Sequence, residues 1–199
     1  MAIIRCTTKL LNELGAKPTN APDQPPGLCD WHANLLWLDR KKYVLFTNDQ
    51  ILYSLLVHWM KTPWSADFLE RFRFGLFKSL MSEGLAEAQV EYVLSEHAQV
   101  TITKTSSRSV LGSMNDLAFQ IKSMIRMSGG LADADLSEIT RQLNRIPMSA
   151  IKYKVGINEL KRRLADASPT QGYQKLCLEN GSFFDTIRFI IIIYLTVLL

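Results

Sequence analysis

The sequence predicts an α+β fold, in which a small and mainly antiparallel sheet is packed by four to five helices. In the first half, two apolar runs, 31–38 and 43–49, flank the charged turn 39–42, which is the pattern of a β-hairpin. A third apolar run, 51–58, extends the hairpin to a three-stranded meander. In the second half, apolar residues recur at spacings of three and four, which is typical of helices.

A short strand at Ile3–Thr7 is expected at an edge of this sheet. Thr7 or Thr8 then caps a helix that stops at Gly15, because a threonine hydroxyl accepts from the free N–H groups of a first turn and glycine suits a left-handed helix end. Residues 17–30 contain four prolines, so this stretch is predicted to be a loop.

The remaining elements are predicted from periodicity and cap residues. Ser65 offers an N-cap to a helix that carries Phe68, Phe72, Leu76 and Leu80 at intervals of four. The other predicted elements are a helix at 87–97, a strand at 100–103, a helix from Ser109 through the methionine-rich core stripe ending at Met124, a helix at 135–144 that Pro147 follows, and a basic helix at 158–164.

We expect one α+β domain at residues 1–165, a polar linker at 166–182 and an apolar appendage at 183–199. Phe189–Leu199 has 11 uncharged residues and as a helix would span about 16 Å, whereas a hydrocarbon core of about 30 Å takes about 20 residues. Three interpretations stay open: a weak peripheral or tail-anchored membrane attachment, an extra strand built on Ile190–Ile193, and a stray translated end, which we rank first.

The chain carries a net charge of +4, and its positive charge is concentrated in one part of the sequence. Residues 100–163 hold 11 Lys and Arg against 5 Asp and Glu, whereas the remainder holds 12 against 14. Clustered Lys and Arg favour a nucleic acid or another anionic partner, because neutralised phosphates release condensed counterions. The simpler alternative is a basic face that meets only solvent.

The three cysteines, Cys6, Cys29 and Cys177, are widely spaced, with neither a C-x-x-C pair nor a Cys/His ligand cluster. We therefore expect no metal site, no cofactor and no disulfide framework. The stretch Met1–Leu11 lacks the apolar core of a signal peptide, so we expect a cytoplasmic protein.

The sharpest candidate site is an anion-binding loop between the strand at 100–103 and the helix that follows. Its residues are Lys104, Thr105, Ser106, Ser107, Arg108 and Ser109. Unpaired N–H groups and the positive end of the helix dipole suit a phosphate or carboxylate, and Arg108 can grip it with two hydrogen bonds. The alternative is that Ser107 or Ser109 only caps the helix, while Lys104 and Arg108 are solvated or paired with a carboxylate such as Glu96.

His32 and Asn34 share one face of the first hairpin strand, since side chains alternate along a strand. They suggest a general base beside an orienting amide. No nucleophile lies nearby in sequence, so no catalytic residue is assigned, and Arg40 and Asn115 are the other weak polar candidates. Aromatic residues of the strands could stack on exposed bases, although core packing explains them more simply. These aromatic residues are Trp37, Tyr43, Phe46 and Tyr53.

Three sequence blocks together resemble a bacterial family catalogued as a domain of unknown function, some of whose relatives are plasmid-borne. The blocks are Arg5-Cys6-Thr7 with Lys9-Leu10-Leu11, Trp31-His32 with Asn34-Leu35, and Lys104-Thr105 with Arg108-Ser109, Gly112 and Asn115. The resemblance implies a domain over about residues 1–165 and no catalytic residue. The apolar tail departs from the family pattern.

The leading hypothesis is a non-enzymatic cytosolic binding module whose basic C-terminal half contacts an anionic partner such as nucleic acid. The alternatives are a small hydrolase or phosphoryl-transfer enzyme that uses His32, Asn34 and the 104–109 loop, and a membrane-attached accessory protein that uses the tail.

Overall fold

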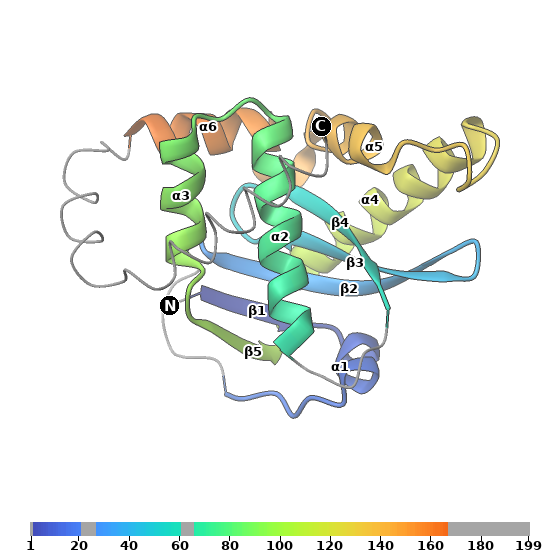
Figure 1. Cartoon of the computed structure of the whole chain (residues 1–199), viewed down its shortest axis with the longest axis horizontal. Coiled ribbons are helices and arrows are strands. Elements are labelled where there is room, and N and C mark those ends of the chain that lie inside the picture. Colours follow the sequence, from blue (N-terminus) through green and yellow to red (C-terminus); the bar gives the residue numbers. More distant parts are fainter. Residues whose placement is uncertain (1, 21–26, 61–65, 167–199) are drawn as a thin grey trace, which may run out of the picture. The chain divides into compact units, whose positions relative to one another are not determined.

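The structure, a computed structural model, describes residues 2–20, 27–60 and 66–166 (Figure 1). Its strands are β1 Ala2–Cys6, β2 Asp30–Leu38, β3 Lys41–Asn48, β4 Ser54–Trp59, β5 Val100–Lys104, β6 Pro147–Met148 and β7 Lys154–Val155. Its α-helices are α1 Thr8–Leu14, α2 Ala66–Ser82, α3 Glu87–Glu96, α4 Arg108–Met127, α5 Leu136–Leu143 and α6 Gly156–Asp166, with a 3₁₀ turn at Ser149–Ile151. The predicted α+β class is confirmed.

The main sheet has five strands in the order β4-β3-β2-β1-β5 and is mixed. β2, β3 and β4 form the predicted antiparallel meander, whereas β1 runs parallel to both of its neighbours. The prediction of an edge position for the first strand is wrong, because β5, nearly a hundred residues later in the chain, pairs with the outer side of β1. The edge strands of the sheet are β5 and β4.

The predicted cap and end of α1 are confirmed, and the hairpin turn lies within the predicted segment. The Thr7 hydroxyl accepts from the N–H of Leu10 at 3.4 Å, and Gly15 ends α1 with a φ of +62°. The hairpin turn is shorter than the sequence suggests, with only Asp39 and Arg40 between the strands, at φ of 43° and 64°. Left-handed backbone at both positions matches the twist of the two strands, so the hairpin closes tightly.

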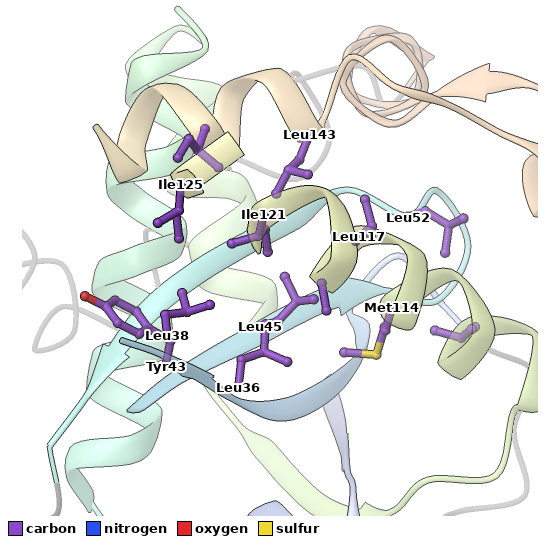
Figure 2. Packing of buried hydrophobic residues seen from close by; sticks show 13 residues of the cluster. Leu36, Leu38, Tyr43, Leu45, Leu52, Met114, Leu117, Ile121, Ile125 and Leu143 are labelled. Atoms are coloured by element: carbon purple, nitrogen blue, oxygen red, sulfur yellow. The ribbon is translucent and has the colours of Figure 1, made fainter. Parts of the chain in front are cut away.

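Helices cover both faces of the sheet (Figure 1). On the face of α2 and α3, Trp31 and Phe46 pack against Phe72 with ring centroids 5.3 and 4.8 Å apart, and the Trp31 indole donates to His97 Nε2 at 2.8 Å. α4 covers the other face. Figure 2 shows the apolar residues that join α4 to this face, among them Leu36, Leu45, Met114, Leu117 and Ile121. The methionine stripe is core at Met114, which is fully buried.

A row of polar residues crosses the sheet on the face of α4. Its members pair in register from β4 to β5 and are Ser54, Thr47, His32, Arg5 and Thr103. All five are buried. The row adjoins the apolar cluster under α4, so one face of the sheet is divided into a polar part and an apolar part.

The C-terminal predictions are only partly within the described chain. The helices predicted at 135–144 and 158–164 correspond to α5 and α6, and α6 begins two residues earlier than predicted. The expected Ser65 cap and the apolar segment 183–199 lie outside the described residues. Residues 1–164 form the first of two units into which the chain divides. Over the described ranges, no helix combines the length and hydropathy that crossing a membrane needs.

Candidate functional site

A pocket opens where β1 ends beside β2. β1 pairs with β2 only as far as Ala33, so within the described residues Asn34–Leu38 has β3 on one side and no strand on the other. α1 and α4 both contact β2 here. The pocket is about 410 Å³ in volume, and its lining residues are Lys9, Asn34, Leu35, Leu36, Trp37, Asn115, Ala118, Phe119 and Lys122.

The helix side of this pocket is one stripe of α4. Asn115, Ala118, Phe119 and Lys122 follow one another at spacings that place them on a single helix face. The neighbouring stripe of the same helix is the buried one that packs on the sheet. Phe119 remains 68% exposed, although aromatic side chains usually bury most of their surface. α4 therefore presents an aromatic ring to solvent at the mouth of the pocket.

A second depression adjoins the first. It is about 380 Å³ in volume, and its lining residues are Trp37, Leu38, Asp39, Lys122, Ile125, Arg126, Gly129 and Gly130. Trp37 and Lys122 line both depressions, so the two are continuous along α4. We call the two together the α4 groove. The Asp39 carboxylate accepts from the backbone N–H of Leu131 at 3.0 Å, which fixes the hairpin turn to the segment after α4.

The α4 groove is positively charged. Among its lining residues, Lys9, Lys122 and Arg126 carry positive charge, and Asp39 carries the one negative charge. Lys42 is not a lining residue; it lies 5.1 Å from the centre of the Trp37 ring, and its charge is paired with Glu13 at 2.8 Å. The register pairs Trp37 with Lys42 and Lys42 with Trp59, which packs on α2. The Trp37 side chain, 46% exposed, therefore points to the α2 face of the sheet, and the residue lines the groove at the edge of β2.

The groove also holds amides with free hydrogen-bonding capacity. The Asn34 oxygen accepts from the Thr7 hydroxyl at 3.1 Å, and its Nδ2 has no partner within the described chain. Asn115 is exposed and, in the same part of the structure, its amide makes no hydrogen bond. Two amides, the Phe119 ring and three cations therefore line one groove.

The predicted anion-binding loop lies outside the lining of the α4 groove. Ser107 caps α4, since its Oγ accepts from the N–H of Val110 at 3.3 Å, which is the simpler of the two interpretations. Lys104 and Arg108 are exposed, and neither pairs with a carboxylate of the described residues. The carboxylate of Glu96 instead accepts from Cys29 Sγ at 3.7 Å.

The other residues of the 104–109 loop are exposed or partly exposed. Thr105 donates its backbone N–H to the Cys6 carbonyl at 3.2 Å, which holds the loop beside the start of α1. Ser106 and Ser109 are exposed. Arg40, the remaining candidate of the hairpin, is also exposed at the turn and lines neither depression.

Comparison with known proteins supplies the family. A family model described as Domain of unknown function (DUF6933) matches residues 3–159. The chain belongs to the DUF6933 family. The match covers the positions of all three sequence blocks and every residue that lines the α4 groove. No curated protein and no solved structure matches this DUF6933 chain.

His32 of this DUF6933 domain belongs to a buried ionic network rather than to the groove. Its Nδ1 lies 2.5 Å from Asp49 Oδ1, and the other oxygen of Asp49 accepts from Arg5 at 2.6 Å. Arg5 also reaches Asp30 at 3.3 Å. The imidazole is completely buried, so a substrate in solvent has no access to it in this structure.

Two polar atoms beside Arg5 lack a partner in the described chain. They are His32 Nε2 and Thr103 Oγ1, and both belong to strand residues that pair in register with Arg5. No described group of three or more His, Cys, Asp or Glu side chains has the arrangement of a metal site. The side chains of Arg5, Asp30, His32 and Asp49 are at most 7% exposed, so their network is part of the core.

Most of the lining residues of the groove were not predicted from the sequence. Asn34 and Asn115 were predicted as weak polar candidates, and the structure brings them to the same pocket; Trp37, predicted among the aromatic residues of the strands, is also a lining residue. Lys9, Phe119 and Lys122 were not among the predicted site residues. An exposed aromatic residue next to the core stripe of a DUF6933 helix, with a lysine three residues later, was the available signal.

Proposed function

We propose that this DUF6933 chain is a non-enzymatic cytosolic binding module and that the α4 groove binds the phosphate backbone of a nucleic acid. The observation that supports this most is the gathering of Lys9, Lys122 and Arg126 in one groove whose only carboxylate, Asp39, is already hydrogen bonded. Cations that face an open concave surface gain from releasing the counterions of a polyanion.

The 104–109 loop extends the proposed contact surface. Lys104 and Arg108 are exposed, and the Thr105 to Cys6 hydrogen bond places their loop next to α1, which carries Lys9. We assign these two cations to additional phosphates at the side of the groove. The free thiols of Cys6 and Cys29 suit the reducing cytosol that the proposal assumes.

An enzymatic role for His32 has less support. The imidazole is completely buried and held by Asp49, and Asn34, its partner in the catalytic hypothesis, is hydrogen bonded to Thr7 and lines the groove instead. A general base must reach the proton it removes. The open α4 groove is therefore the better candidate for the functional site.

A salt titration tests the proposal. Fluorescence anisotropy of a labelled 20-nucleotide strand would be followed with the full chain from 50 to 200 mM salt. Three neutralised phosphates give a slope of log K against log salt of about −2, so affinity should fall by about 20-fold over this range. Lys9→Ala and Lys122→Ala should each make the slope shallower by about 0.7.

A charge on the opposite side of the sheet supplies the control. Lys78 lies on α2, so Lys78→Ala should leave both the affinity and the slope unchanged. Lys104→Ala and Arg108→Ala report separately on the loop. The proposal fails if no strand binds at 50 mM salt, or if the two groove variants bind as the Lys78 variant does.

A further inference from the structure

We infer that the edge of β2 in the α4 groove takes an added strand, which is an extended acidic segment of a partner protein. This inference goes beyond the function proposed above, because phosphate contacts use the cations of the groove and not the main chain of β2. The two ligands share those cations, so the segment competes with nucleic acid for the groove.

The main chain of β2 is unpaired along one side of the groove. β1 pairs with β2 only as far as Ala33, and the hairpin of β2 and β3 extends past this point (Figure 1). The Ala33 carbonyl accepts from the N–H of Thr7 at 3.0 Å, so the main-chain groups of Ala33 face the β1 side. These groups alternate between the two sides of a strand, so Leu35 and Trp37 also present an N–H and a C=O there, and no described strand pairs with them.

These unpaired main-chain groups lie in the groove. Leu35 and Trp37 both line its pocket, although their side chains point to the α2 face, so they line it with the edge of the strand. Leu35 is only 3% exposed, and N–H and C=O groups that are removed from water almost always have a partner. An added strand would supply the partners that β1 does not.

The shape of the groove suits an extended ligand. Asn34 and Asn115 line the pocket, and Leu38 and Arg126 line the second depression, so the groove follows β2 and α4 together. Asn34 to Leu38 spans about 13 Å at about 3.3 Å per residue, which lets about five residues of a segment pair with it. Addition of an extended segment to an open strand edge is an established mode of peptide recognition.

The charges favour an acidic segment. The groove is lined by three exposed cations, Lys9, Lys122 and Arg126, and its one carboxylate, Asp39, is already hydrogen bonded. Opposite charges across an interface select the partner, whereas a second copy of this chain would bring like charges together at this edge. Phe119, 68% exposed, offers apolar surface to an apolar residue of the segment.

Methylation of the peptide main chain separates strand addition from attraction between charges. A labelled peptide of about eight alternating glutamate and valine residues would be titrated with the full chain by fluorescence anisotropy at about 50 mM salt. The same peptide with every main-chain N–H methylated keeps its charges and loses its donors. It should bind at least about tenfold more weakly than the parent peptide, because several hydrogen bonds are lost.

Two pairs of variants test the edge and the exposed ring. Trp37→Pro removes an N–H that faces away from β3, and it should bind the peptide at least about threefold more weakly than Trp37→Ala, which loses the same ring but keeps the N–H. Phe119→Ala should weaken binding by about fivefold, and Phe74→Ala, which removes an exposed ring from α2, serves as the matched control. Thermal unfolding checks that each variant is folded. If Trp37→Pro does not fold, the methylated peptide decides alone.

The outcomes distinguish this inference from the function proposed above. Equal binding of the parent and methylated peptides, or no binding of the parent up to about 1 mM, would overturn strand addition and leave nucleic-acid binding standing. A chain that sediments as a dimer and does not bind the peptide would assign the edge to a second copy and overturn the inference as well.

Competition provides the last comparison. The parent peptide should displace the labelled nucleic-acid strand, because both ligands use Lys122 and Arg126. If the bound peptide left the strand in place, the nucleic acid would bind elsewhere and the site proposed above would be wrong. Peptide binding without any nucleic-acid binding would overturn the proposed function and leave strand addition standing.

Discussion

Replacing Asp49 with Asn tests whether the buried network of Arg5, Asp30, His32 and Asp49 stabilises the fold through charge. Asp49 contacts His32 and Arg5 at 2.5 and 2.6 Å, and its side chain is only 5% exposed. The amide keeps the shape, but it removes the charge and can place an N–H group against another donor. Removing one partner of a buried ion pair costs about 3–5 kcal/mol, and the remaining contact of Arg5 with Asp30 at 3.3 Å favours the lower end.

The assay is thermal unfolding of the full chain at pH 7. For a domain of this size each kcal/mol shifts the melting temperature by about 2–4 °C, so a loss of about 3 kcal/mol should lower it by about 6–12 °C. Asp116→Asn, a change of the same chemistry at an exposed position of α4, should shift it by less than about 2 °C. If Asp49→Asn behaved like Asp116→Asn, the network would be contributing no net stability and our reasoning would be refuted.

Two further predictions concern His97 and the glycines of α2 and α4. Burial lowers the pKa of His97 from 6.5 to about 4, so the folded state binds fewer protons than the unfolded state between these values, and stability should fall by up to about 3 kcal/mol as pH drops from 6.5 to 4. In urea titrations at pH 6.5 and 4, His97→Gln should lose part of this dependence, and an identical loss in both proteins would contradict it. A Cβ on Gly75 would lie 2.6 Å from Val57 Cγ2, so Gly75→Ala should destabilise the fold by about 1–3 kcal/mol. Gly112 has open space around it within α4, so Gly112→Ala should stabilise the fold by about 0.5–1 kcal/mol, and urea unfolding that ranked the two variants in reverse would count against both packing arguments.

Local patterns predicted the elements well because their causes are local. The threonine cap of α1, its glycine stop and the strands on either side of the hairpin turn are set by residues a few positions apart. The central position of β1 could not be predicted in this way. It depends on pairing with Val100–Lys104, and nothing in that short strand specifies which of the distant strands it will join.

The candidate site was also predicted only in part. The alternation of side chains along a strand predicted that His32 and Asn34 share a face. Their surroundings in the structure nevertheless differ completely. Asp49 reaches His32 from the segment after β3, whereas Asn34 lies just past the last residue that β1 pairs with. Both arrangements depend on where the neighbouring strands end, and the sequence of β2 does not determine those positions.

The polar row from Ser54 to Thr103 also constrains how the strands align. Side chains alternate between the faces of a sheet, so a slip of β1 by one residue would turn Arg5 toward the apolar side occupied by α2 and leave Asp49 and Asp30 without their guanidinium. Parallel pairing between β1 and β5 gains no guidance from a tight turn, because the two strands are far apart in the chain. The buried charges therefore specify the register, and a misaligned main sheet would lose these contacts in a row that runs through all five of its strands.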